Sequence, residues 1–125
     1  MSPEDRNRLR HMIDAARTAQ RFLLGRQRSD LDTDDMLRFA VVRAIEIIGE
    51  AASRITPEGR ARIAGIPWPA IISMRNRMVH AYFDIDHDVV WQTVQTELNP
   101  LLSVLEHALG QTDGSKTTLH APTQQ

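Results

Sequence analysis

The sequence predicts an all-α fold, an up-down bundle of four main helices with one additional short helical turn. Three observations predict it: Gly and Pro number only six each in 125 residues, apolar residues recur at three- and four-residue intervals, and turn residues separate these periodic segments. With 42% apolar residues, the chain can fill one core. We therefore expect one helical domain over residues 1–110 and a flexible polar tail over residues 111–125.

The first helix is expected to begin at Ser2, a residue type that caps helix N-termini, with Pro3 at the first helical position. Gly25 is its expected end. The apolar residues that recur at helical intervals are Leu9, Met12, Ile13, Ala16, Ala19 and Leu23. Such a stripe predicts a helix that packs one face on the core.

A polar connector over residues 29–35 leads into a second helix, over residues 34–54. Its apolar stripe comprises Leu37, Ala40, Val41, Ala44, Ile45, Ile48, Ala51, Ala52 and Ile55. Because Val42 and Ile47 widen this stripe, we expect the helix to be covered on more than one side. In so small a bundle, the second covering surface can be another subunit.

The third helix is expected over residues 69–79, with Pro69 at its first position. Before it, Thr56 and Pro57 interrupt the second helix, and residues 58–64 form a short helical turn. Trp68 is expected to be an anchor in the core or in an interface rather than a platform for a base.

The fourth helix is expected over residues 86–109, capped by Asp86. Pro100 lies in its middle, so we expect a kink or a break there. Gly110 is its expected end, and the polar residues that follow show no helical periodicity.

The composition excludes several classes of protein. Without cysteine there are no disulfides and no thiolate metal sites. No apolar run approaches the roughly 18 residues of a membrane span, and the N-terminus has no apolar signal segment. We expect a cytoplasmic protein without a membrane partner and without a cofactor.

The charge is unevenly distributed, although the net charge is only −1. Residues 54–80 carry five Arg against the single Glu58, whereas residues 78–115 carry acids and neither Lys nor Arg. An anionic substrate is therefore expected to meet the segment over residues 54–80.

Within that segment, Arg75, His80 and Tyr82 place a guanidinium, an imidazole and a phenol inside eight positions. The planar donors of Arg suit phosphate oxygens. His can take and give a proton near neutral pH. Tyr82 can pack, stack on a base or donate to a phosphate. These side chains suffice to cleave RNA without a metal, with Arg75 and His80 as the candidate catalytic residues.

Helical geometry constrains how these side chains share a site. At 100° per residue, Asn76 and His80 are nearly aligned, whereas Tyr82 would point away from His80. The third helix is therefore expected to end near His80, with the site on its last turn and the following loop. Asn76 can orient the ring of His80 or donate to a phosphate oxygen, and Arg77 is a supporting cation.

Glu46 and Glu50 lie four residues apart on the second helix and so share a face. They form a solvated acidic face, or they hold Arg75 or Arg77 in place from the neighbouring helix. A two-metal carboxylate site needs Glu-x-x-His motifs from two helices. The nearest match is a single copy, Asp84-x-x-His87, so no metal is expected.

The spacing Arg75-x4-His80-x-Tyr82, with Asn76 directly after Arg75, resembles the R-x4-H-x-Y signature of HEPN-domain proteins. The resemblance is closest to the HepT-like toxins. Two further segments share it: Ile-Ile-Gly-Glu-Ala-Ala at residues 47–52, and Ile-Pro-Trp at residues 66–68. Together these segments extend the similarity over residues 5–110.

The resemblance implies the toxin of a type VII HepT/MntA-like toxin–antitoxin pair, a metal-independent endoribonuclease that cleaves tRNA or mRNA. It also implies an MntA-like nucleotidyltransferase antitoxin that inactivates the toxin by AMPylation of the motif Tyr. Tyr82 is therefore the expected modification site. RNA is the expected substrate, and no DNA partner is expected.

Each chain contributes one motif His, whereas acid–base cleavage is most efficient with one proton donor and one acceptor. A two-fold dimer that apposes two motif segments would bring two His80 and two Arg75 into one cleft. We therefore expect a homodimer with a composite site, which the resemblance also implies. The alternative is a non-catalytic helical module that binds a nucleotide or a nucleotidyltransferase.

Overall fold

The computed structural model describes residues 1–80 and 84–117, with side chains as far as Gly110. Its helical elements are α1 (Pro3–Leu23), α2 (Asp30–Thr33), α3 (Asp35–Ser53), α4 (Pro57–Ala61), α5 (Trp68–Ile72), α6 (Met74–Met78), α7 (His87–Gln92), the π-helical turn η2 (Thr93–Glu97) and α8 (Leu98–Thr117). Over the described residues, the only extended pairing is an isolated bridge between Val79 and Ile85. The predicted all-α fold is confirmed.

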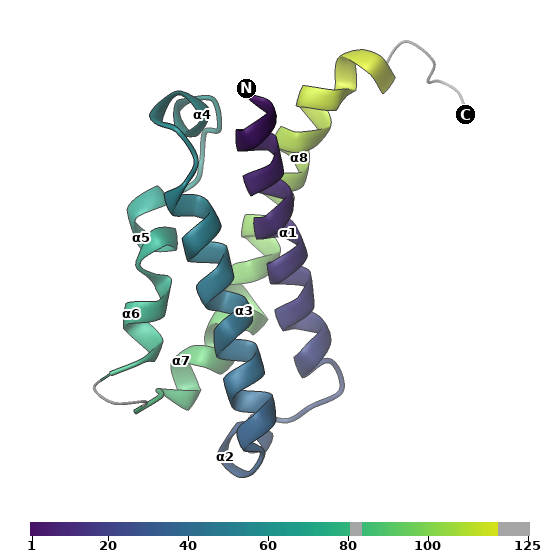
Figure 1. Ribbon diagram of the computed structural model, residues 1–125. Helices are drawn as coiled ribbons and strands as arrows, with labels where there is room; N and C mark the ends of the chain where they lie inside the picture. The colour runs from purple at the N-terminus through teal and green to yellow at the C-terminus, as the bar shows by residue number, and fades with distance from the viewer. Residues whose placement is uncertain (81–83, 118–125) are drawn as a thin grey trace.

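α1 and α3 lie side by side at the centre of the bundle (Figure 1). Leu9 and Met12 of α1 and Ile45 and Ile48 of α3 are completely buried. α8 packs on α1, and α5 and α6 pack on α3, so the core is enclosed by elements from the whole chain (Figure 1).

The expected coverage of α3 on more than one side is confirmed. Val42, at the edge of the apolar stripe, is 6% exposed. A Cβ atom added to Gly49 would lie 3.0 Å from the carbonyl oxygen of Ile72, so the backbones of α3 and α5 approach closely there. This close approach brings the candidate segment that follows α5 against α3.

The expected starts of the first and fourth helices are confirmed by side-chain caps, whereas the third helix begins at Trp68, so that Pro69 is its second residue. Ser2 Oγ accepts a hydrogen bond from Asp5 N, and Asp86 Oδ1 accepts one from Val89 N. Thr56 caps α4 in the same way, and the connector after α1 contains the short helix α2. α1 ends before Gly25, because Leu24 is already extended. Gly25, whose φ of 75° suits Gly, lies in the turn in which Arg26 N donates to Leu23 O.

The prediction of one continuous third helix over residues 69–79 is wrong. The helix is divided at Ser73, whose hydroxyl donates to Pro69 O at 2.8 Å. A serine side chain that bonds to the carbonyl four residues earlier favours such a bend. α6 then ends at Met78, and Val79 is already extended.

A break of the fourth helix at Pro100 was one predicted outcome, and it is wrong, because the helical elements continue through Pro100. The irregularity lies upstream instead, in the π-helical turn η2. In η2 the N–H of Leu98 bonds to the oxygen of Thr93, five residues earlier. Pro100 is the third residue of α8, so the widened turn lies just before the proline. The helical path therefore continues through the proline.

α8 runs past Gly110 to Thr117, so the predicted end at Gly110 is wrong. A glycine lowers helix propensity by about 1 kcal/mol relative to alanine, but it ends a helix only where the backbone turns. Residues 118–125 lie outside the described residues, and the division into a domain and a tail stays a prediction.

Trp68 is 9% exposed, and its indole donates to Arg60 O at 3.3 Å, which confirms the expected anchor in the core.

Within residues 1–80 and 84–117, no helix combines the length and the hydropathy needed to cross a bilayer.

Candidate active site

Arg75 lies on α6 and contacts α3. Its Nε donates to Oε2 of Glu46 at 2.6 Å, and the Arg75 side chain is 52% exposed while that of Glu46 is 21% exposed. A guanidinium held through Nε leaves its terminal N–H groups directed elsewhere, where they can meet a phosphate. The contact with Glu46 thus holds the guanidinium of Arg75 at its Nε, and the side chain remains half exposed.

The two carboxylates predicted to share a face of α3 both contact Arg43, but their shortest hydrogen bonds go to different arginines. Glu46 contacts Arg75, whereas Glu50 Oε2 accepts a hydrogen bond from Arg43 at 2.8 Å. Arg43 also reaches Oε1 of Glu46 at 3.5 Å. The hydrogen bond with Glu50 raises the pKa of Arg43. Of the two predicted supports, Glu46 is the one that touches a motif residue among those the structure describes.

Arg77 lies about 200° from Arg75 around the axis of α6. Its NH2 and NH1 donate to the two carboxylate oxygens of Glu97 at 3.0 and 3.3 Å. This two-point pair joins α6 to η2, so Arg77 and Arg75 tie the motif helix to opposite neighbours. The role of Arg77 as a supporting cation stays a prediction.

His80 lies beyond α6 on extended backbone. Its N–H donates to Asp84 O at 2.7 Å, and Asp86 N donates to Met78 O at 2.6 Å, so residues 78–80 pair with residues 84–86. The expected alignment of Asn76 with His80 required helix through His80 and does not apply, because α6 ends at Met78.

The His80 side chain is 54% exposed, and its Nε2 lies 3.9 Å from Asp86 Oδ2. That separation permits an ion pair when the imidazole is protonated but is too long for a hydrogen bond. Asn76 is exposed on α6. Among the described residues no hydrogen bond joins Arg75 to His80. Tyr82 lies outside the described residues.

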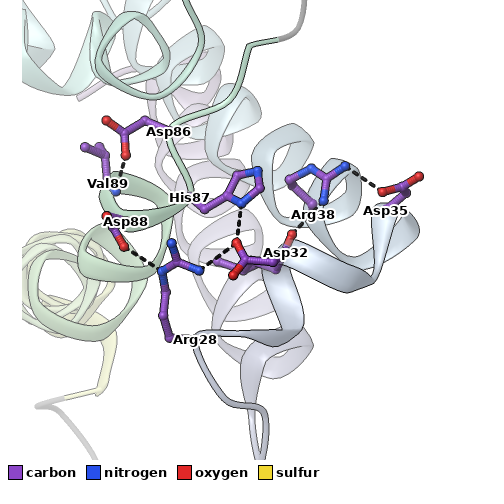
Figure 2. Close-up of polar contacts among 9 residues, drawn as sticks. Arg28, Asp32, Asp35, Arg38, Asp86, His87, Asp88 and Val89 are labelled. Atoms are coloured by element: carbon purple, nitrogen blue, oxygen red, sulfur yellow. Dashed lines mark hydrogen bonds and ion pairs between the residues drawn. The ribbon is translucent and has the colours of Figure 1, made fainter.

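A polar network that sequence reasoning missed holds the start of α7, directly after Asp86 (Figure 2). His87 Nδ1 lies 2.6 Å from Asp32 Oδ1. Arg28 donates to Asp32 at 2.9 Å and to Asp88 at 2.6 Å. The hydrogen bonds with His87 and then with Arg28 hold the pKa of Asp32 below its usual value.

The signal for this network was the acidic connector over residues 29–35, which carries charges that its capping role does not need. The network fixes one end of the segment that bears His80, because α7 begins at His87.

In the part of the chain that the structure describes, no three His, Asp or Glu side chains are placed to hold a metal ion.

The segment over residues 75–80 thus presents an accessible guanidinium, an amide and an imidazole. The first two can bind phosphate oxygens, and the third can transfer protons. A single chain supplies one such imidazole.

The comparisons with known proteins agree on one family. The family model described as ribonuclease HepT-like matches residues 12–108. A protein of Thermococcus cleftensis named a probable ribonuclease HepT is 39% identical over 77 residues, which cover 62% of this chain and 70% of the relative. No solved structure matches significantly.

Two further relatives are provisionally named as RNases. One, from Methanocaldococcus jannaschii, is 37% identical over 57% of this chain and 65% of its own length. The other, from Caldanaerobacter subterraneus, is 36% identical over 58% of this chain and 64% of its own length. The match thus spans slightly less than two thirds of both relatives. Since the family model covers most of the bundle, including Arg75 and His80, the chain belongs to the HepT-like ribonuclease family.

Proposed function

We propose that this protein is a metal-independent endoribonuclease, the toxin of a type VII HepT/MntA-like toxin–antitoxin pair that cleaves tRNA or mRNA. The observation that carries the proposal is the geometry of residues 75–80. Arg75 is fixed at its Nε by Glu46, and His80 lies exposed on paired backbone just beyond the same helix. Membership in the HepT-like ribonuclease family supports the same chemistry.

The reaction needs no group beyond RNA and these side chains. A base removes the proton of a ribose 2′-hydroxyl, whose oxygen attacks the adjacent phosphorus. The bond to the 5′-oxygen of the next nucleotide breaks, and an acid returns a proton to that oxygen. The products are a 2′,3′-cyclic phosphate and a 5′-hydroxyl. His80 transfers protons, while Arg75 and Asn76 donate to the phosphate oxygens, where negative charge develops.

A homodimer completes the site in this proposal. With one His80 per chain, two chains related by a two-fold axis supply both the acid and the base. Specific activity should then fall on dilution in parallel with the dimer fraction measured by sedimentation. Constant specific activity in a strictly monomeric preparation would contradict the composite site.

Cleavage of RNA in EDTA is the direct test. We expect wild type to produce 2′,3′-cyclic phosphate ends, and Arg75→Ala and His80→Ala each to reduce the rate at least about 100-fold. Arg10→Ala, which removes an exposed Arg of α1 outside residues 54–80, is the matched control and should cleave normally. Cleavage that persists in both motif variants, or that requires an added metal ion, would exclude this mechanism.

Regulation is proposed to act on Tyr82, through an MntA-like antitoxin that transfers AMP to its hydroxyl. Added nucleotidyl groups carry negative charge close to Arg75 and His80 in sequence and would repel and displace substrate phosphate. Intact-mass measurement after co-expression with the neighbouring gene should show added nucleotidyl mass on wild type. The same added mass on Tyr82→Phe would assign the modification elsewhere.

A further inference from the structure

A second concave surface lies away from the motif helix, between the C-terminal end of α1 and the α7–η2–α8 segment. It is a cleft of about 380 Å³ lined by Gln20, Leu24, Arg26, Trp91, Gln95 and Asn99, among others. Its volume falls in the range of small-molecule sites. The residues that line the cleft belong to α1, the loop after it, α7, η2 and α8, whereas the contact that positions Arg75 joins α6 to α3, so the two are separate. Figure 1 shows where these elements lie.

The cleft combines apolar surface with groups that recognise the edge of a base. Trp91 is half-buried, and Leu24 is 81% exposed. Gln20, Gln95 and Asn99 add three carboxamides, each with both a donor and an acceptor. Arg26 supplies the single formal charge among the residues that line the cleft.

The carboxamides are partly preorganised. Gln20 Nε2 donates to Asn99 Oδ1 at 2.7 Å, a bond that joins α1 to α8 across the cleft. This bond uses one donor and one acceptor, so Gln20 Oε1 and the Nδ2 donors of Asn99 can meet a ligand. An acceptor beside donors is the arrangement with which Asn and Gln read base edges.

The wall that carries Leu24 and Arg26 is fixed from outside the cleft. Arg28, two residues beyond Arg26, bonds to Asp88 on α7 and to Asp32 on α2 (Figure 2). These contacts hold the end of the 24–28 segment against α7, the helix that bears Trp91. Within the described residues, the one ion pair of Arg26 is a long one with Asp34, at 3.4 Å, and its side chain is 44% exposed. Its guanidinium can therefore turn towards a phosphate.

We propose that this cleft binds an unpaired nucleobase of the single-stranded RNA substrate, stacked on Trp91 and read at its edge by Gln20 and Asn99, with Arg26 on a flanking phosphate. Aromatic side chains that stack on splayed bases, together with amides at the base edge, are the usual means of recognising single-stranded RNA. This inference rests on the proposed function, since it takes RNA to be the substrate. In this proposal, the cleft selects unpaired segments of the RNA substrate.

The test measures binding separately from cleavage. His80→Ala protein keeps the RNA intact, and the probe is a short, unstructured, fluorescein-labelled RNA oligonucleotide followed by anisotropy. In this background we expect Trp91→Leu to weaken binding about tenfold and Asn99→Ala about five- to tenfold. Gln92→Ala, an exposed amide next to Trp91 that does not line the cleft, is the matched control and should bind normally.

A spectroscopic readout locates the base. RNA should quench tryptophan emission, and the quenching should vanish in Trp91→Leu, because the remaining Trp68 is buried. Melting followed by circular dichroism establishes that the variants are folded. Asn99 is exposed, so Asn99→Ala keeps the test valid if Trp91→Leu fails to fold.

Other occupants give different results. Duplex RNA that binds as tightly as the single strand, or a mononucleotide that binds as tightly as the oligonucleotide, would overturn the assignment to an unpaired base of a strand. Normal RNA binding by both cleft variants would also overturn it. A shift in sedimentation without a change in RNA affinity would make the cleft a protein interface instead. Weakened binding by the cleft variants, in a protein whose wild type fails to cleave RNA, would support the cleft and refute only the nuclease proposal.

Discussion

The Nε of Arg75 donates to Oε2 of Glu46 at 2.6 Å, across the contact between α6 and α3. The two residues lie 29 positions apart in the sequence. Because Glu46 is mostly shielded from solvent and Arg75 is half exposed, the carboxylate restrains the guanidinium without covering its outer face. We therefore propose that Glu46 positions Arg75.

Glu46→Gln should lower the kcat for RNA cleavage about 10- to 100-fold, because a guanidinium that is displaced by about 1 Å stabilises the transition state less well. KM should change less, since the charge of Arg75 is retained. Steady-state cleavage kinetics measure both constants. Glu50→Gln is the control: Glu50 lies on the same face but holds Arg43. Equal losses in the two variants would show that only the general charge of this face matters.

Asp5→Asn should destabilise the fold by about 1–3 kcal/mol at neutral pH, because it places an amide where buried donors require an acceptor. Asp5 is 2% exposed and accepts hydrogen bonds from Thr56 N at 3.0 Å and Thr56 Oγ1 at 2.5 Å. Urea denaturation of both proteins gives the difference. An unchanged midpoint would mean that Asp5 contributes nothing to stability.

The effect of Asp5 should depend on pH. Burial by itself raises the pKa of Asp5, but the hydrogen bonds from Thr56 outweigh it and hold the pKa below the ordinary value of 3.8. The stabilisation is therefore present above that value and is lost as pH falls through the lower pKa of the folded state. The difference in stability between wild type and Asp5→Asn should narrow in that acidic range; a constant difference would argue against ionisation as its source.

Gly59→Ala should destabilise the protein by about 1–3 kcal/mol through overpacking. A Cβ atom at residue 59 would lie 2.5 Å from Asp5 Oδ2 and 2.9 Å from Ile55 Cγ2. Gly110→Ala is the matched control, because a Cβ there would meet no described atom within 4 Å. The control should be neutral or stabilising by about 0.5–1 kcal/mol, since Ala favours a helix. Thermal melts of both variants test the contrast, which would fail if Gly59→Ala were neutral.

Arg28→Lys should loosen the start of α7 with little change in overall stability. Lys has no fork of donors with which to bond Asp32 and Asp88 together, and such exposed contacts contribute little to global folding. Hydrogen exchange should show faster exchange of the Val89 and Val90 amides. Arg21→Lys, on the exposed face of α1, serves as control. Unchanged exchange in Arg28→Lys would show that the network does not restrain α7.

Sequence patterns were sufficient for the elements whose causes are local. The caps of Ser2 and Asp86 and the turn at Gly25 depend on neighbours within a few residues. The broad apolar stripe of α3 likewise predicted its burial on more than one side. The division at Ser73 was missed because a serine in a helical pattern does not by itself show whether its hydroxyl will bond back to the carbonyl four residues earlier. The π-helical turn before Pro100 was missed because it depends on how the segment fits its packing partners.

The sequence by itself determined that the chain is a helical bundle and that Arg75, Asn76, His80 and Tyr82 form its candidate motif, because helical periodicity and short-range spacing are written in the chain. Only the tertiary structure decided that Glu46 rather than Glu50 contacts Arg75, that Arg77 pairs with Glu97, and that Asp32 joins Arg28 and His87. Such pairings depend on which helix faces meet, and the crossing of helices is fixed by the packing of the whole core.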